Sequence, residues 1–208
     1  PLEYDSLMRQ MAERLAAVLR NRDRIAWLDN GRFAIILHPT PRPDLESMIQ
    51  LSGRLQKAVE APFSVAAQTI TATVHVGFAL MHRAPEMTGA SLLASAELAA
   101  EEAKRFGPSA IRAYSIEIQK AAKARSELVS EIAPALDRGE IQAQFQPQIN
   151  TDTGDVSGVQ ALPRWIHADR GTLNETDILP AVEAAGLQNR FAEVILFDCF
   201  AAIQKWRK

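Results

Sequence analysis

Residues 20–37, which read RNRDRIAWLDNGRFAIIL, decide the fold of the first half of the chain. Two apolar runs, at residues 24–28 and 33–37, flank a short polar turn that contains the pair Asn30-Gly31. Asparagine and glycine tolerate the positive φ angles of a tight turn, and an Asn-Gly pair between apolar runs is a strong hairpin signal. The stretch therefore predicts a β-hairpin.

Hydrophobic patterns on both sides of the hairpin predict further helices and strands. Apolar residues recur at spacings of three and four over residues 5–19, which is typical of a helix. Apolar and polar residues alternate over residues 69–80, which predicts one strand. The other elements expected in this half are a proline-rich loop at residues 38–43, helices at Leu45–Glu60 and residues 91–105, and a short strand at residues 110–115.

The second half of the chain predicts another unit of helices and strands. A polar helical stretch at residues 116–124 is expected to link the halves, and Pro134 is expected to disturb a helix at residues 126–137. Strands are expected at Ile141–Ile149 and residues 156–165, followed by a helix that ends near Gly186 and another at residues 189–206. The patterns predict an α/β (α+β) fold with domains at residues 1–115 and 125–208 around a linker helix at 116–124.

The composition limits the functions that the chain can have. Its 208 residues carry a formal net charge of −2, and hydrophobic residues make up 47% of them. This balance is typical of a soluble globular protein and lacks the broad positive charge that binds nucleic acid or acidic membranes. No apolar run reaches the length of a membrane span, and the single cysteine, Cys199, excludes an internal disulfide. We therefore expect a cytoplasmic protein with neither nucleic acid nor membrane as a partner.

Residues 1–115 resemble a GGDEF domain that lacks its N-terminal part. The hairpin lies where that family carries its signature, and the helix that begins at Asp5 resembles a family helix. Residues 71–79 resemble the family pattern T.S.G.A, and residues 96–104 resemble the AD.AL…AK helix. The resemblance implies a nucleotidyl-cyclase sheet with flanking helices. Members of the family condense two GTP molecules into cyclic di-GMP, using carboxylates that hold magnesium.

The signature itself departs from the family pattern. Where the family has Gly-Gly-Asp-Glu-Phe, residues 29–33 read Asp-Asn-Gly-Arg-Phe. Gly31 and Arg32 stand at the positions of the two acids, and the carboxylate of Asp29 is displaced by two positions. Glycine and arginine cannot hold a divalent cation, because such cations prefer carboxylate oxygens. The sequence predicts that this domain retains no catalytic residue, no metal site and no cofactor.

Arg20 and Asp23 form an RxxD tetrad at the spacing of the family's inhibitory site. By resemblance, such a site binds cyclic di-GMP: Arg20 would contact a phosphate and a guanine edge, and Asp23 would accept hydrogen bonds from guanine. A planar guanidinium suits bidentate contacts of this kind. The alternative is an ordinary charged turn between a helix and a strand. Lys104 matches a lysine that contacts phosphate in the family, the alternative being a cation that complements the carbonyl end of its helix.

From residue 125 the chain resembles the opening of an EAL domain, a TIM-barrel-like phosphodiesterase that cleaves cyclic di-GMP with metal-activated water. Residues 144–149 resemble the family's YQP strand, residues 160–165 its EALLRW strand, and residues 178–187 its FIP.AEE.GL helix. Gln160 replaces the glutamate that is a metal ligand in the family. A neutral amide is a poor substitute for a carboxylate, so the sequence predicts that neither magnesium nor manganese is retained here.

The positions that contact the dinucleotide in the EAL family are matched by Gln146, Leu162, Arg164 and Pro180. By resemblance, Arg164 would meet a phosphate and the other residues would shape the base pocket. Core packing is the alternative for Leu162 and Pro180. Arg164 falls near the C-terminal end of a predicted barrel strand, where the functional residues of barrels gather.

Three functional hypotheses remain open. The first is a catalytically degenerate sensor that binds cyclic di-GMP through the RxxD tetrad, the EAL-like pocket or both, and that is expected to form a homodimer. The second is a cyclic di-GMP phosphodiesterase whose remaining barrel lies outside this sequence. The third is a dimerisation scaffold that acts without nucleotide. The first is favoured, because both acidic signatures are lost while Arg20, Asp23 and Arg164 persist.

Overall fold

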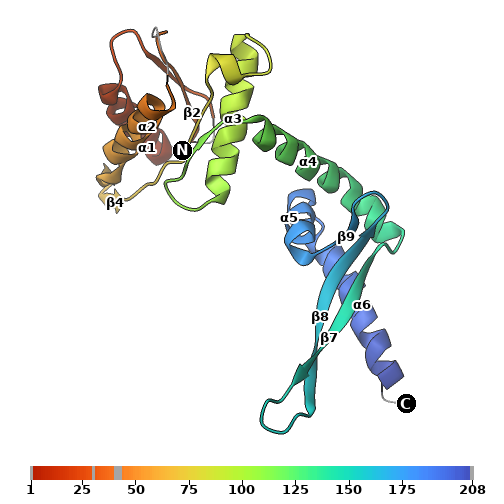
Figure 1. Ribbon diagram of the computed structural model, residues 1–208. Coiled ribbons are helices and arrows are strands. Elements are labelled where there is room, and N and C mark those ends of the chain that lie inside the picture. The colour runs from red at the N-terminus through yellow and green to blue at the C-terminus, as the bar shows by residue number, and fades with distance from the viewer. Residues whose placement is uncertain (1, 30, 40–43, 207–208) are drawn as a thin grey trace. The chain divides into compact units, whose positions relative to one another are not determined.

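The computed structural model describes residues 2–29, 31–39 and 44–206, and the chain divides into two compact units, Pro1–Lys120 and Ala121–Lys208 (Figure 1). Each unit combines helices with small sheets, which confirms the predicted α/β class. Asn30 and residues 40–43 of the predicted proline-rich loop lie outside the described residues.

The predicted hairpin of the first unit is confirmed. Strands β1 (Arg24–Trp27) and β2 (Phe33–Ile36) pair antiparallel, with Trp27 opposite Phe33. The backbone N–H of Leu28 donates to the carbonyl oxygen of Arg32 at 2.9 Å and closes the connection. Gly31 has a φ of +75°, in the left-handed region that glycine enters without steric cost.

The hairpin shares an apolar core with two helices. Helix α1 (Leu2–Val18) buries residues at spacings of three and four, which confirms the predicted amphipathic helix. Helix α2 (Leu45–Glu60) begins at Asp44, whose carboxylate accepts a hydrogen bond from the N–H of Ser47 at 2.6 Å. The buried residues of this core, which also includes the short strand β3 (Phe63–Val65), are Met8, Met11, Leu15, Leu55, Val59, Phe63 and Val65.

The segment at residues 69–80 forms two strands, so the prediction of one strand is wrong. Strand β4 (Gln68–Ile70) pairs antiparallel with β3, whereas β5 (Val76–Phe78) pairs in parallel with β6 (Ile111–Ala113). The two strands have different partners, and an alternating pattern carries no information about which strand will pair with it. Helix α3 (Gly89–Arg105) follows the short 3-10 helix η1 (Met81–Arg83) and packs against β5 and β6.

The second unit contains a three-stranded antiparallel sheet in the order β7 (Ile141–Ile149), β8 (Val156–His167) and β9 (Gly171–Leu173). Helix α4 (Ile116–Asp137) starts in the first unit and continues into the second without a break. Residues 116–124 are therefore the first part of a longer helix, and Pro134 lies inside it.

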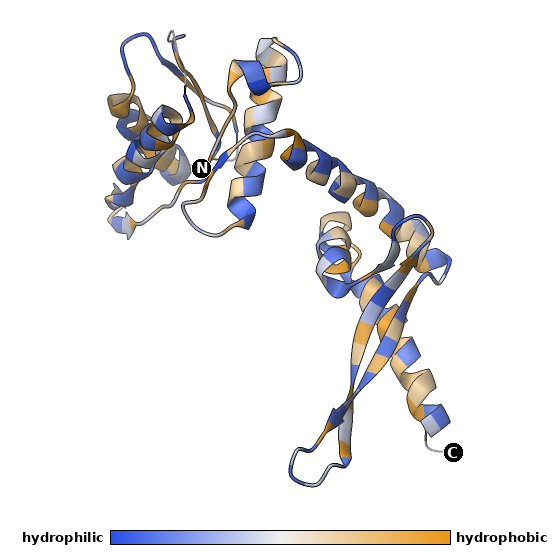
Figure 2. Ribbon diagram, in the orientation of Figure 1, coloured by the Kyte–Doolittle hydropathy of each residue, from blue (hydrophilic) through white to orange (hydrophobic). Residues whose placement is uncertain are grey.

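Two further helices, α5 (Glu175–Ala185) and α6 (Gln188–Trp206), pack with α4 and the sheet around one core. Trp165, Ile132 and Ile178 are among its most deeply buried side chains. Hydrophobic residues also extend along the length of α6 (Figure 2), where Phe197 is 74% and Phe200 63% exposed. Within the described residues, no helix combines the length and the apolar character needed to cross a membrane.

Candidate functional site

The RxxD tetrad lies in the connection between α1 and β1. The carboxylate of Asp23 accepts hydrogen bonds from the backbone N–H of Arg20 and from that of His38, each at 2.9 Å. Burial opposes the charged form of Asp23, but these two hydrogen bonds outweigh it and hold the pKa of the carboxyl below its usual value. Asp23 therefore ties the end of α1 to the segment that follows β2.

Arg20 lines a basic hollow with a volume of about 600 Å³. The other lining residues come from α2 and include two further cations, Arg54 and Lys57, beside the polar side chains of Ser47 and Gln50. Residues 47, 50, 54 and 57 follow helical spacing, so they lie along one face of α2. Sequence reasoning missed these residues, although the polar face of an amphipathic helix directly after the hairpin was the signal that could have found them.

The signature positions of the hairpin carry an ion pair. The Nε of Arg32 donates to Oδ1 of Asp29 at 2.7 Å, and Nη1 of Arg32 lies 3.5 Å from Oε1 of Glu97 on α3. The hydrogen bond to Asp29 raises the pKa of the Arg32 guanidinium above its usual value. Gly31, beside it, contributes only backbone atoms. Lys104 lies in the last turn of α3, at the carbonyl end of that helix.

The register of β7 and β8 brings together the site residues predicted in the second unit. Gln146 lies opposite Gln160, Gln144 opposite Leu162, and Gln142 opposite Arg164. Directly opposite residues share a face of an antiparallel pair, and so do residues two apart along a strand. Gln160, Gln146, Leu162 and Arg164 therefore line one surface, which we call the β7–β8 polar face. Sequence reasoning missed Gln142 and Gln144 because their place on this face depends on the register.

Pro180 lies on α5, a helix that packs against β8, and it is exposed. Arg164 donates from Nη1 to the carbonyl oxygen of Pro163 at 2.8 Å, which holds the guanidinium close to its own strand. Among the described residues, no group of three or more histidine, cysteine, aspartate or glutamate side chains gathers as a metal site would.

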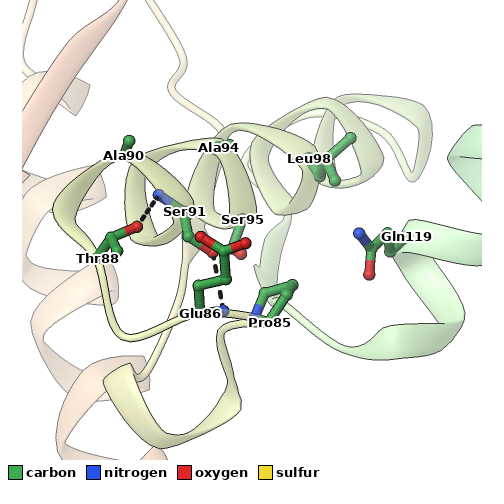
Figure 3. A pocket seen from close by; sticks show the side chains of 9 residues that line it. All are labelled: Pro85, Glu86, Thr88, Ala90, Ser91, Ala94, Ser95, Leu98 and Gln119. Carbon is green, nitrogen blue, oxygen red and sulfur yellow. Dashed lines mark hydrogen bonds between the residues drawn. The ribbon is translucent and has the colours of Figure 1, made fainter.

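A second hollow, of about 360 Å³, opens beside the start of α3 (Figure 3). Thr88 caps the helix by accepting from the N–H of Ser91 at 3.1 Å, and the Ser91 hydroxyl accepts from the N–H of Glu86 at 3.2 Å. Small side chains form most of the lining, with Gln119 of α4 on the far side. No sequence motif predicted this hollow, and its polar groups serve mainly to fix the start of α3.

Two family models match the chain, in the order that the sequence predicted. The model for "Diguanylate cyclase, GGDEF domain" matches residues 3–109, and the model for "EAL domain" matches residues 129–208. The tandem organisation predicted from the sequence is thereby confirmed.

Curated relatives match the chain nearly from end to end. MucR of Pseudomonas aeruginosa, a bifunctional diguanylate cyclase/cyclic di-GMP phosphodiesterase, is 25% identical over 97% of this chain and 29% of its own length. NbdA of the same species, a cyclic di-GMP phosphodiesterase, is 27% identical over 92% of this chain and 24% of its own length. An uncharacterised protein of Sinorhizobium fredii, y4lL, is 28% identical over 97% of this chain and 24% of its own length. The chain thus spans about a quarter of the length of these relatives.

Solved structures share the fold at low sequence identity. The S helix-GGDEF-EAL segment of Vibrio cholerae LapD, bound to c-di-GMP, aligns with a TM-score of 0.57 and 13% identity, covering 98% of this chain and 47% of that one. The GGDEF domain of TpbB (YfiN) from Pseudomonas aeruginosa aligns with a TM-score of 0.54 and 23% identity, covering 58% of this chain and 69% of that one.

Proposed function

The chain belongs to the diguanylate cyclase GGDEF domain family and continues into an EAL domain, and from this premise we propose that it is a non-catalytic module that senses cyclic di-GMP. The relatives support the choice of ligand, because MucR and NbdA are named for activities on cyclic di-GMP and the LapD segment was solved with it.

The basic hollow beside the RxxD tetrad carries the proposal. Its volume of about 600 Å³ falls in the range of small-molecule sites, about 300–1,000 Å³. Arg20, Arg54 and Lys57 supply positive charge for the phosphates of a cyclic dinucleotide, and guanidinium groups can form bidentate hydrogen bonds with phosphate. Gln50 supplies an amide that both donates and accepts, as the edge of a guanine base requires.

The β7–β8 polar face of the second unit would provide a separate second site, where another molecule of cyclic di-GMP could bind. Arg164 is its cation, and Gln146 and Gln160 face each other across the strands with amide donors and acceptors. Leu162 adds an apolar surface on which a base can pack, and Pro180 would border it from α5. Each half of the chain would thus hold cyclic di-GMP by charge and hydrogen bonds.

The residues at the family's metal positions do not fit a divalent cation. Arg32 is itself a cation, Gly31 has no side-chain donor, and Gln160 offers a neutral amide where magnesium or manganese prefers a carboxylate. We therefore assign neither cyclase nor phosphodiesterase chemistry to these residues. Lys104 is assigned to the carbonyl end of α3 rather than to phosphate binding.

Isothermal titration calorimetry with cyclic di-GMP tests the proposal. Wild type should bind, Arg20→Ala and Arg54→Ala should each weaken binding at the first site at least about tenfold, and Arg164→Ala should weaken the second site. Arg83→Ala, which removes an exposed arginine of the same unit outside the hollow, should bind like wild type. No heat from wild type at two temperatures would overturn the proposal.

A phosphodiesterase is the second candidate, favoured by the named activity of NbdA. It predicts that purified protein linearises cyclic di-GMP when manganese is added and stops when a chelator removes the metal. Gln160→Glu then becomes informative, because restoring a carboxylate should increase turnover only where the other metal ligands are present. Turnover by protein that carries Gln160 would contradict the non-catalytic assignment.

A further inference from the structure

Two side chains near the turn between β8 and β9 contact helix α4. Arg170 donates from Nη1 to the carbonyl oxygen of Ala124 at 3.1 Å, and its Nη2 lies 2.5 Å from a carboxylate oxygen of Glu127. The Nε2 of His167 lies 2.6 Å from Oε2 of Glu131. Positions 124, 127 and 131 are spaced by three and four, so they lie along one face of the helix. We call these five residues the clasp.

The ring of His167 is held at both nitrogens. The backbone N–H of Asp169 donates to Nδ1 at 3.1 Å, and since a backbone amide only donates, Nδ1 is the acceptor. The neutral ring then carries its proton on Nε2 and donates it to Glu131. The side chain is only 9% exposed, and its ring centroid lies 5.1 Å from that of Trp165. These contacts fix the orientation of the His167 ring, which thereby connects the turn after β8 and strand β8 itself to helix α4.

The clasp reaches further along α4 than the apolar core does. The buried residues of α4 begin at Leu128 and end at Leu136, and none of residues 116–127 is buried. In that stretch, Arg170 forms hydrogen bonds to the carbonyl oxygen of Ala124 and to the carboxylate of Glu127. Buried apolar groups are non-directional, whereas a guanidinium that binds a carbonyl and a carboxylate together fixes orientation as well as distance. The clasp thus adds about one turn of α4 to the part that the second unit holds.

We propose that the clasp makes α4 move with strand β8 from Ala124 onward. A displacement of β8 would then pass directly to the helix that leads from the first unit into the second. Arg164, on the β7–β8 polar face, lies only a few residues before His167 on the same strand. The coupling of ligand to helix rests on the proposed function, whereas the mechanical link between strand and helix does not.

Hydrogen exchange of the ligand-free chain, read by mass spectrometry, tests the link. In Arg170→Ala, amides at residues 121–128 of α4 should exchange about tenfold faster than in wild type, because local opening no longer breaks the two hydrogen bonds of Arg170. Arg170→Lys keeps the positive charge but loses the planar guanidinium, so its exchange rates should lie between those of wild type and Arg170→Ala. His167→Gln should speed exchange around Glu131. Arg83→Ala, which removes an exposed arginine of the first unit outside the clasp, should match wild type in α4.

Exchange in α5 serves as the internal reference for folding. Unchanged exchange at residues 121–131 in both Arg170→Ala and His167→Gln, with α5 as protected as in wild type, would overturn the proposal. If Arg170→Ala also loses protection in α5, that variant has lost its fold, and the proposal is tested on Arg170→Lys and His167→Gln. Unchanged exchange at residues 121–131 in these two proteins would then overturn it. Calorimetry on the same proteins distinguishes failure of the proposed function from failure of the clasp proposal. If wild type binds no cyclic di-GMP, the proposed function is refuted, and the exchange rates of α4 still test the clasp.

Discussion

Replacing Gly77 by alanine tests the packing of the first unit at its tightest point. A Cβ at this position of β5 would lie 1.9 Å from the backbone nitrogen of Ala100 and 2.5 Å from the carbonyl oxygen of Ala96, both on α3. Restoring ordinary contact near 3.5 Å requires strand and helix to separate by about 1.5 Å. The contacting atoms belong to the helix backbone and cannot rotate away. We therefore expect a loss of about 3 kcal/mol, at the upper end of the usual cost of overpacking.

Differential scanning calorimetry and urea unfolding of Gly77→Ala measure this loss. A cost of about 3 kcal/mol should lower the melting temperature of the first unit by about 10 °C. Gly53→Ala is the matched control, because it makes the same chemical change within α2, where nothing lies within 4 Å of the added Cβ. That variant should gain about 0.5–1 kcal/mol. A midpoint for Gly77→Ala within about 2 °C of wild type would refute the close approach of β5 and α3.

Three further changes probe the second core, the hairpin turn and the tetrad. Ile132→Ala should cost about 3 kcal/mol in urea unfolding, because the side chain is fully buried in the second core; a loss below about 1 kcal/mol would contradict that burial. Gly31→Ala should cost about 1 kcal/mol because of its positive φ, and an unchanged midpoint would argue against that conformation. The folded pKa of Asp23 is depressed, so its stabilisation is present above the unfolded value of about 3.9 and is lost as the pH falls through the folded pKa. Urea midpoints of wild type and Asp23→Asn should therefore differ at pH 6 and approach each other as the pH falls through the folded pKa of Asp23, and a difference that does not change with pH would contradict the assignment.

Local signals in the sequence predicted the elements whose structure depends mainly on near neighbours. The hairpin follows from the apolar runs around Asn30-Gly31, and α1 follows from its regular apolar spacing. The strand expected at residues 69–80 failed because β4 and β5 join different partners, and partner choice is a tertiary property.

The candidate site divides in the same way. Arg20 and Arg164 were found from motifs that are local in sequence; in the structure Arg20 lines the basic hollow and Arg164 lies on the β7–β8 polar face. Arg54 and Gln142 were missed because helix packing brings the first beside Arg20 and strand register brings the second opposite Arg164. Neither relation is visible until the elements have partners.

The basic hollow and the signature hairpin differ in electrostatic character, and this contrast supports the proposed ligand. Arg32 is paired with Asp29 and also lies near Glu97, so its charge is largely compensated on a surface where water already screens such pairs. The basic hollow is different, because Arg20, Arg54 and Lys57 lie together and none of its lining residues is an acid. Asp23 lies close enough to Arg20 for their charges to interact, but the three cations outnumber it, so the hollow attracts an anion and repels a metal ion. The hollow thus offers three cations to phosphate groups, whereas the signature hairpin, whose cation already has its counterions, offers little to either a nucleotide or a metal.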